Sequence, residues 1–106
     1  MEEIIEILRQ FRDKRDWKKY HSPKNLAVSM AIEVSELMEI FQWTRSLEEE
    51  MGLLKDKRDE IAEELADVMI YLLFFCDVAG IDILKAVKNK MAKNEERFKI
   101  ESEQKS

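Results

Sequence analysis

Two pairs of acidic residues occupy positions where helical periodicity predicts side chains facing a core. In the segment 23–43, an apolar stripe from Leu26 to Ile40 advances in alternating steps of four and three residues, and Glu33 falls within that stripe. Glu36 lies three residues further on, about 60° around the same side of a helix. The pattern therefore predicts carboxylates that point inward rather than into solvent.

Glu64 and Asp67 have the same spacing of three residues and lead directly into the apolar run 68–76. Ionised carboxylates that converge in a partly dry bundle repel one another, and each loses its hydration at a cost of several kcal/mol unless a positive charge compensates. A positive group is therefore expected between the two pairs.

A divalent cation is the expected partner of these carboxylates. Lysine and arginine are absent from the matching inward positions of the two segments, although a buried ion-pair network stays open as an alternative. Oxygen donors without thiolate or imidazole favour Mg²⁺ or Mn²⁺ over zinc or copper. A carboxylate-bridged di-iron bundle would need a Glu-x-x-His motif on each of two helices, and the single histidine, His21, lies outside both pairs.

Mg²⁺ in a helical bundle indicates phosphate chemistry, because the ion neutralises an anionic substrate, aligns it and lowers the pKa of a bound water. Lys90, Asn94 and Arg97 lie four and then three residues apart on one face of a further helix, a spacing suited to phosphate oxygens. Solvent exposure of basic residues on a terminal helix is the simpler interpretation of this face.

Ring-bearing side chains flank the carboxylate pairs. They are Trp17, Tyr20, His21, Trp43 and Tyr71. Flat side chains one or two turns from a metal cluster can stack on a nucleobase while the metal holds the phosphates. Ordinary core packing is the alternative for Trp43 and Tyr71.

The elements that must position these residues are helices. Only two glycines and one proline occur in 106 residues, too few for a sandwich or barrel, whereas 39% charged and 45% hydrophobic residues suit amphipathic helices. The expected fold is an all-α four-helix bundle, with one domain over residues 1–100 and a polar C-terminal tail over residues 101–106.

Boundary signals divide the chain into helices. The expected long helices span about residues 2–19, 23–43, 54–79 and 83–100, with a short helix that starts at Leu47 and that Gly52 ends. The predicted N-terminal caps are Ser22 before Pro23, Ser46 in a capping box with Glu49, and Asp82. Gly80 is the predicted left-handed residue that closes the longest helix.

The apolar run 68–76 surrounds its helix on all sides, so it needs cover on every side. Three partner helices in one small chain barely supply that cover. Other subunits are therefore expected to contribute, in a homodimer or a homotetramer.

Charge and composition exclude several classes of partner. With 18 Lys and Arg against 23 Asp and Glu, the net charge of -5 opposes binding to nucleic acid or to an anionic membrane. The apolar run is about half of the ~20 residues needed to span a bilayer. Because the one cysteine, Cys76, cannot form an internal disulfide and the acidic start lacks signal-peptide features, a cytoplasmic location is expected.

Three segments together resemble a known family: RDWKKYHSPKNLAVSMAIEVSELMEIFQW, EELADVMIYL and KMAKNEERF. They are similar to the MazG-like all-α nucleoside triphosphate pyrophosphohydrolases, most closely to the dCTP pyrophosphatase branch, over about residues 4–98. The resemblance implies hydrolysis of a (deoxy)nucleoside triphosphate, with dCTP or a modified dCTP among the candidates, to monophosphate and pyrophosphate as nucleotide-pool house-cleaning. Leu8 stands where that branch carries a base-contacting histidine, so the preferred base stays open.

The resemblance also implies residue roles. The implied catalytic Mg²⁺ ligands are Glu33, Glu36, Glu64 and Asp67, and the implied nucleotide-binding residues are Trp17, Tyr20, His21, Asn25, Trp43 and Tyr71. The C-terminal face of Lys90, Asn94 and Arg97 would bind phosphates. Family members form dimers or tetramers with sites between subunits.

Two alternatives stay open at this point. One is a related hydrolase that acts on another nucleotide, such as phosphoribosyl-ATP. The other is a non-catalytic helical assembly module, in which the carboxylates of the two pairs close ion pairs.

Overall fold

The computed structural model describes the backbone of residues 1–105 and the side chains of residues 1–98. Within this part every regular element is helical. The elements are α1 (Glu2–Lys14), the 3-10 helix η1 (Lys18–Tyr20), α2 (Pro23–Phe41), α3 (Leu47–Asp56), α4 (Arg58–Ala79) and α5 (Ile83–Lys105). The prediction of an all-α fold is confirmed. None of the helices described is long and apolar enough to cross a membrane.

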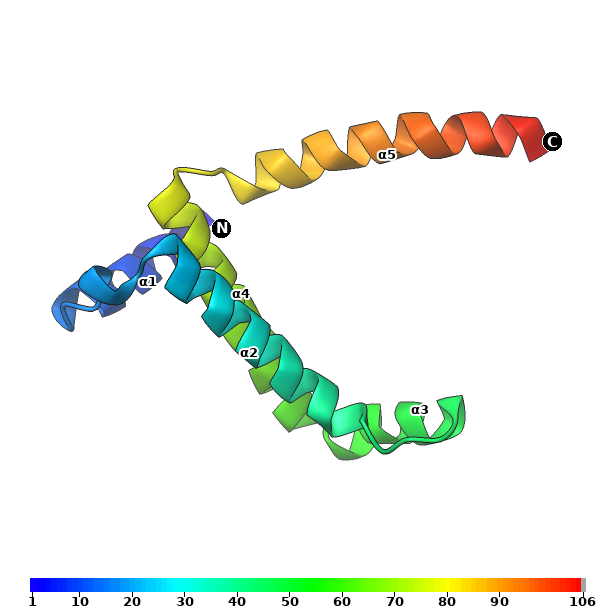
Figure 1. Cartoon of the computed structure of the whole chain (residues 1–106), viewed down its shortest axis with the longest axis horizontal. Helices are drawn as coiled ribbons and strands as arrows, with labels where there is room; N and C mark the ends of the chain where they lie inside the picture. Colours follow the sequence, from blue (N-terminus) through cyan, green and yellow to red (C-terminus); the bar gives the residue numbers. More distant parts are fainter. Residues whose placement is uncertain (106) are drawn as a thin grey trace.

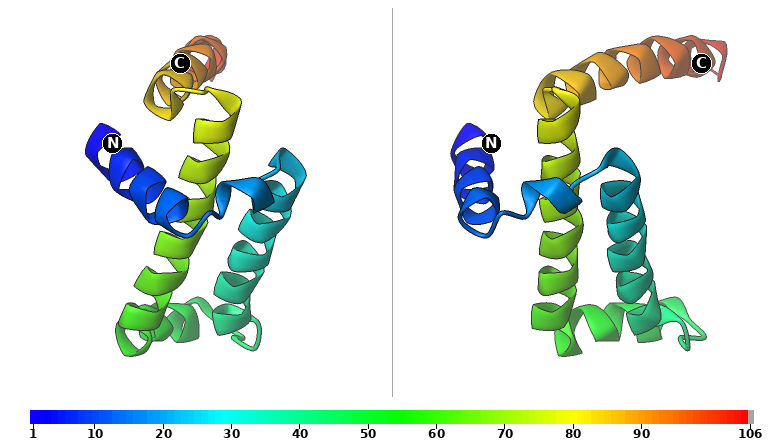
Figure 2. Two further views of the ribbon diagram at one scale, coloured as in Figure 1. Left: turned by 90° about the vertical axis from the view of Figure 1, so that its left-hand side faces the viewer. Right: turned by 60° about the vertical axis from the view of Figure 1, so that its left-hand side comes forward.

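An antiparallel pair formed by α2 and α4 is the framework of the chain (Figure 1). The short helix α3 joins the two at one end of the pair, and α1 packs against α4 near the other end. The last helix, α5, leaves the pair at the end of α4 and projects away from it (Figure 2). The chain by itself thus consists of a helix pair with attached arms.

The buried apolar core lies within the α2/α4 pair. Among the described side chains, the buried apolar residues are Leu26, Ile61, Leu73, Phe74 and Cys76. Many other large apolar side chains are exposed, including Ile32, Met38, Leu65, Leu84 and Met91. A single chain therefore leaves much apolar surface uncovered.

Helices α2 and α3 begin at the serine N-caps that the sequence predicts. Ser22 Oγ accepts a hydrogen bond from the Asn25 amide at 3.1 Å, and Pro23 occupies the first turn of α2. Ser46 Oγ accepts one from the Glu49 amide at 3.1 Å. Glu49 Oε2 in turn accepts from the Arg45 amide at 2.6 Å, one residue earlier than in a standard capping box.

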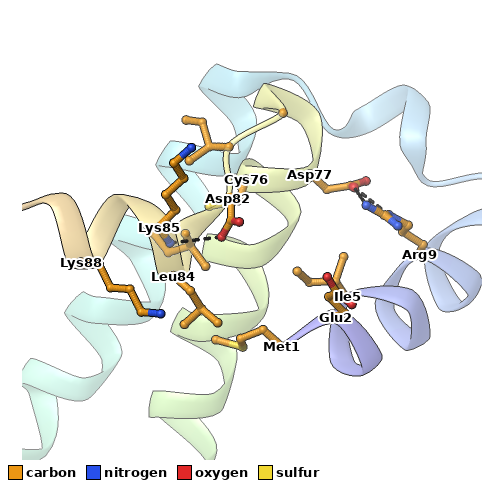
Figure 3. Close-up of a pocket in the computed structure, with 13 residues that line it drawn as sticks. Met1, Glu2, Ile5, Arg9, Cys76, Asp77, Asp82, Leu84, Lys85 and Lys88 are labelled. Atoms are coloured by element: carbon orange, nitrogen blue, oxygen red, sulfur yellow. Dashed lines mark hydrogen bonds and ion pairs between the residues drawn. The ribbon is translucent and has the colours of Figure 1, made fainter.

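The end of α4 and the start of α5 also follow the prediction. Gly80 has φ 67° in the left-handed region, and the Ile81 amide donates to the Cys76 carbonyl at 2.9 Å, as in a Schellman motif. Asp82 Oδ1 accepts a hydrogen bond from the Lys85 amide at 3.2 Å and caps α5 (Figure 3).

The first helix is shorter than predicted, because α1 ends at Lys14 rather than at Lys19. Asp16 has φ 54°, and the Trp17 amide donates to the Arg12 carbonyl at 3.1 Å, so a Schellman motif closes the helix without glycine. The accompanying apolar contact is present as well, since the Phe11 and Trp17 rings meet edge to face at 5.4 Å.

Other boundaries also differ from the prediction. Helix α3 continues through Gly52 to Asp56 and α4 begins at Arg58, because Gly52 keeps a helical conformation, which costs about 1 kcal/mol relative to alanine but does not stop a helix. Helix α2 ends at Phe41, two residues before Trp43. Helix α5 runs past Ile100 to Lys105, through the expected polar tail, whose last residue, 106, lies outside the described residues.

Candidate functional site

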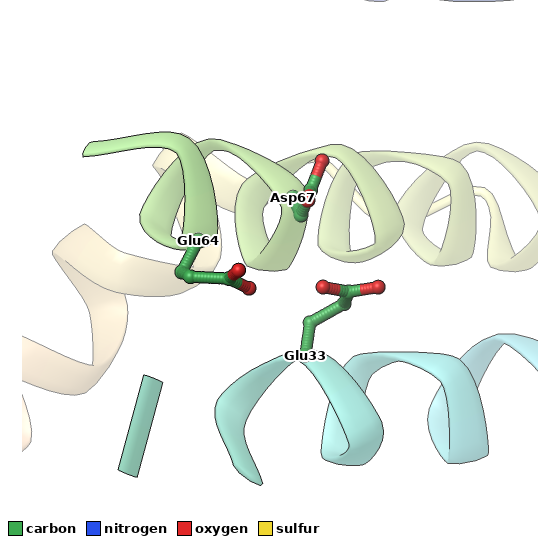
Figure 4. Close-up of side chains that lie close together, drawn as sticks. All are labelled: Glu33, Glu64 and Asp67. Carbon is green, nitrogen blue, oxygen red and sulfur yellow. The ribbon is translucent and has the colours of Figure 1, made fainter. Parts of the chain in front are cut away.

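Three carboxylates converge midway along the α2/α4 pair. Glu33 on α2 and Glu64 and Asp67 on α4 each offer one oxygen, and these oxygens lie within 4.8 Å of one another. The carboxylates of Glu33 and Glu64 face each other between the two helices (Figure 4). Both residues are half-buried, and one oxygen of each is buried without a hydrogen-bond partner. The helical spacing of three residues thus brings Glu64 and Asp67 to the same side of α4 as predicted.

The cluster carries uncompensated negative charge. Burial, followed by the neighbouring carboxylates of Glu36, Glu33 and Asp67, raises the pKa of Glu64 to about 7. Burial, followed by Glu36 and Asp67, also raises the pKa of Glu33. Among the side chains of residues 1–98, no lysine or arginine forms an ion pair with these carboxylates.

These donors fit a divalent cation. Buried carboxylate oxygens ordinarily have partners, and here the two buried oxygens of Glu33 and Glu64 have none. A set that contains only carboxylate oxygens is the one that Mg²⁺ and Mn²⁺ prefer. The residues present therefore suit a hard divalent ion and offer no thiolate or imidazole for a softer one.

The fourth predicted ligand, Glu36, lies beside the three converging oxygens rather than among them. It is exposed, and it lines a cavity of about 480 Å³ next to the cluster together with Glu64. Three further acidic or amide residues of this cavity are Glu39, Gln42 and Glu60, and its single basic residue is Lys57. Lys57 was not anticipated from the sequence, because it lies at the junction of α3 and α4 rather than at an inward helical position.

A second cavity, of about 210 Å³, lies toward the other end of the pair. Five of the predicted nucleotide-binding residues line it, namely Trp17, Tyr20, His21, Asn25 and Tyr71. They come from the segment around η1, from the first turn of α2 and from α4. The structure thus gathers residues that are more than 40 positions apart in the chain, one helical turn from Asp67.

The polar groups of this second cavity are held in defined positions. The Asn25 side-chain amide donates to the Tyr20 carbonyl at 3.1 Å. The His21 ring packs against Phe74 with ring centroids 4.5 Å apart. Burial, aided by the positive charge of Arg12, lowers the pKa of His21, so its imidazole is neutral at physiological pH.

The remaining predicted residues lie elsewhere in the chain. Trp43 is 82% exposed and lines a separate cavity against α3. Lys90, Asn94 and Arg97 are on α5, which projects away from the α2/α4 pair (Figure 2). Within one chain, therefore, neither Trp43 nor the polar face of α5 reaches the carboxylate cluster.

A buried ion pair that the sequence did not suggest joins α1 to α4. Arg12 is 3% exposed, and its Nη1 lies 2.8 Å from Asp77 Oδ2. Arg9 adds a contact of 2.7 Å from its Nε to Asp77 Oδ1 (Figure 3). Burial raises the pKa of Asp77, but the hydrogen bonds from Arg9 and Arg12 outweigh it and hold that pKa below its ordinary value. One signal for the burial of Arg12 was overlooked: it follows the half-buried Leu8 by four residues and therefore lies on the inward face of α1.

Known proteins resemble this chain over most of its length. Residues 28–106 match the MazG-like family. The proteins named dCTP pyrophosphatase 1 from Rattus norvegicus and Mus musculus are each 36% identical over 101 residues, which cover 94% of this chain and 59% of theirs. The chain thus spans about three-fifths of the length of these curated relatives.

A solved structure is also similar. It is the crystal structure of a pyrophosphatase from Archaeoglobus fulgidus, with 62% identity and a TM-score of 0.91 over 92% of this chain and 91% of that one. The family match covers more than half of the chain, and it includes all four predicted metal ligands. The chain therefore belongs to the MazG-like family.

Proposed function

We propose that this chain is a Mg²⁺-dependent nucleoside triphosphate pyrophosphohydrolase, which converts a (deoxy)nucleoside triphosphate into the monophosphate and pyrophosphate. The observation that carries the proposal is the convergence of Glu33, Glu64 and Asp67, which no lysine or arginine among the side chains of residues 1–98 pairs with. The cluster lies one helical turn from the second cavity described above, which we call the aromatic cavity. The names of the relatives, dCTP pyrophosphatase 1 and pyrophosphatase, support the same reaction.

The carboxylates would hold the metal. Glu33, Glu64 and Asp67 supply the three converging oxygens, and Glu36 is the fourth ligand of the proposed set. When bound, Mg²⁺ or Mn²⁺ supplies charge neutralisation of the phosphates and a water of lowered pKa. The hydrolysis adds water at the α-phosphorus and breaks the bridging bond to the β-phosphate, so that pyrophosphate leaves.

The aromatic cavity would bind the nucleoside. Trp17 and Tyr71 offer flat faces for stacking on a base, and stacking accepts any base. The neutral imidazole of His21 and the amide of Asn25 are polar groups at the same cavity. Their arrangement suits a nucleotide but leaves the choice among bases to experiment.

We further propose that the active form is a homodimer or a homotetramer. The buried core of one chain is small, and the apolar residues Leu84, Val87 and Met91 of α5 are exposed. A neighbouring subunit that covers this stripe would also bring a copy of Lys90, Asn94 and Arg97 toward a site on another chain. Light scattering coupled to size-exclusion chromatography is expected to give at least twice the monomer mass, and a monomer that is active at assay concentration would contradict the assembly.

A substrate panel tests the reaction itself. Canonical and modified ribo- and deoxyribonucleoside triphosphates, dCTP among them, and phosphoribosyl-ATP are incubated with the chain with and without Mg²⁺. Release of pyrophosphate that requires Mg²⁺ is expected for at least one nucleoside triphosphate. Release from phosphoribosyl-ATP alone would point to the related hydrolase, and no release from any compound would favour a non-catalytic assembly module.

A further inference from the structure

Three features lie in a fixed order along the α2/α4 pair. The aromatic cavity is at Tyr71, the carboxylate cluster follows at Asp67 and Glu64, and the acidic cavity of about 480 Å³ lies beyond it at Lys57. Because α4 is continuous from Arg58 to Ala79, this order is fixed by the helix itself. A substrate that spans the first two features has its remaining atoms directed at the third.

Lys57 is the single basic residue among those that line the acidic cavity. Its side chain is 54% exposed, and its Nζ lies 3.8 Å from Glu60 Oε2, so the ammonium is only loosely paired. The other charged residues of this cavity are all acidic and would repel an anion; they are Glu36, Glu39, Glu60 and Glu64. Lys57 is therefore the group of the cavity wall that is able to attract one.

The dimensions of the helix suit a nucleoside triphosphate. Glu64 and Lys57 are seven residues apart, or about 10 Å along the axis, and Tyr71 is the same distance from Glu64 on the other side. The flexible side chain of Lys57 covers part of the distance between Lys57 and Glu64. The two phosphates beyond the reacting one extend from the carboxylate cluster and cover more of it. The leaving pyrophosphate thus falls between the carboxylate cluster and the Lys57 ammonium.

We propose that Lys57 is a phosphate-binding residue, which contacts the leaving pyrophosphate end of the substrate and so sets the direction in which the substrate lies along α4. This inference rests on the proposed function. It assigns the nucleoside to the Tyr71 end and the departing phosphates to the Lys57 end. A compact ammonium suits this role because it stabilises phosphate charge as it develops on the leaving group.

Product inhibition tests the direction of binding. The variants are Lys57→Met, the conservative Lys57→Arg, and the matched control Lys55→Met, which removes an exposed lysine of α3 outside the cavity. Inhibition constants for pyrophosphate and for the nucleoside monophosphate are measured at saturating Mg²⁺, and binding of magnesium pyrophosphate is measured by calorimetry.

In Lys57→Met the inhibition constant and the dissociation constant for pyrophosphate are expected to rise about ten-fold, as for the loss of one charge-assisted contact. The inhibition constant for the monophosphate stays within about two-fold of wild type, Lys57→Arg keeps most of the pyrophosphate affinity, and Lys55→Met behaves as wild type. Weaker Mg²⁺ binding cannot produce this result, because removal of a positive charge beside carboxylates strengthens cation binding.

Unchanged pyrophosphate affinity in a folded Lys57→Met variant would overturn the inference, and so would a rise confined to the monophosphate, since that places the nucleoside at the opposite end. The circular dichroism of each variant verifies that the helices are retained. Failure of the wild-type chain to release pyrophosphate is a separate result, which would contradict the proposed function and this inference together.

Discussion

Glu33 on α2 and Glu64 on α4 face each other across the helix pair, and each keeps one buried carboxylate oxygen without a hydrogen-bond partner (Figure 4). Buried acceptors of this kind destabilise the metal-free chain, because lost hydration and mutual repulsion are not offset. A divalent cation that joins them removes both penalties at once. The same arrangement of carboxylates therefore lowers the stability of the metal-free chain and raises its affinity for a divalent cation.

The first prediction concerns Mg²⁺ and thermal stability. Mg²⁺ at millimolar concentration is expected to raise the melting temperature of the wild-type chain, because it binds the folded state alone. Glu64→Gln should melt at a higher temperature than wild type without metal and should lose the response to Mg²⁺. Glu63→Gln, which changes an exposed neighbour, should respond like wild type. Differential scanning fluorimetry decides, and an equal Mg²⁺ response in Glu64→Gln would refute the ligand assignment.

The second prediction is a pH dependence. The pKa of Glu64 is about 7 in the folded chain, against 4.5 ordinarily, so the folded state holds a proton that the unfolded state releases within this window. The contribution of Glu64 to the free energy of unfolding is therefore largest below about pH 4.5, and it is lost as the pH rises through 7.

This dependence is measured as a difference between wild type and Glu64→Gln in metal-free buffer from pH 4.5 to 8. The lowered pKa of His21 contributes with the opposite sign, since stability from that group falls as pH decreases through its unfolded pKa. His21 is present in both proteins, so its contribution cancels. A difference that stays constant with pH would contradict the raised pKa of Glu64.

The third prediction concerns the buried pair of Arg12 and Asp77. Asp77→Ala leaves the Arg12 guanidinium buried with only Asp13 as a partner, and it is expected to lower the free energy of unfolding by about 2–3 kcal/mol. Arg9→Met, which removes an exposed partner of the same carboxylate, should have a much smaller effect. Urea denaturation measures the free energy of unfolding of both variants. Equal losses would contradict the prediction that the burial of Arg12 makes Asp77→Ala the more destabilising change.

The fourth prediction compares the two glycines. Gly52 is helical and an added Cβ meets nothing within 4 Å, so Gly52→Ala is expected to stabilise the chain by about 0.5–1 kcal/mol. Gly80 has φ 67°, where alanine is strained, so Gly80→Ala should destabilise it by about 1 kcal/mol. Chemical denaturation curves of the two variants should therefore shift in opposite directions.

Local signals in the sequence predicted where the long helices lie and that Glu33, Glu64 and Asp67 converge, although Glu36 lies beside that group. The spacing of three residues between Glu64 and Asp67 is a property of the helix itself, so it indicates the shared face before any tertiary contact is known. Ser22, Gly80 and Asp82 act within one turn of the chain, and their roles were predicted for the same reason.

Features that depend on distant contacts or on unusual residues were missed. Asp77 pairs with Arg12 across 65 positions, and periodicity alone gives no partner for either charge. Asp16 ends α1 in a conformation that glycine usually adopts, so no glycine marked the boundary. The direction of α5 depends on the short connection after Gly80, which does not follow from helical spacing.

The most direct test is the rate of pyrophosphate release in Mg²⁺ by wild type, Asp67→Asn and Glu63→Gln. Asp67→Asn removes the negative charge of one of the three converging carboxylates. Glu63→Gln also removes a carboxylate charge from α4, four residues before Asp67, but outside the cluster. The account predicts that wild type and Glu63→Gln release pyrophosphate at similar rates and that Asp67→Asn loses at least about 100-fold, as for loss of an electrostatic group at the reacting phosphate. Turnover by Asp67→Asn at the wild-type rate, with its helices intact, would contradict it.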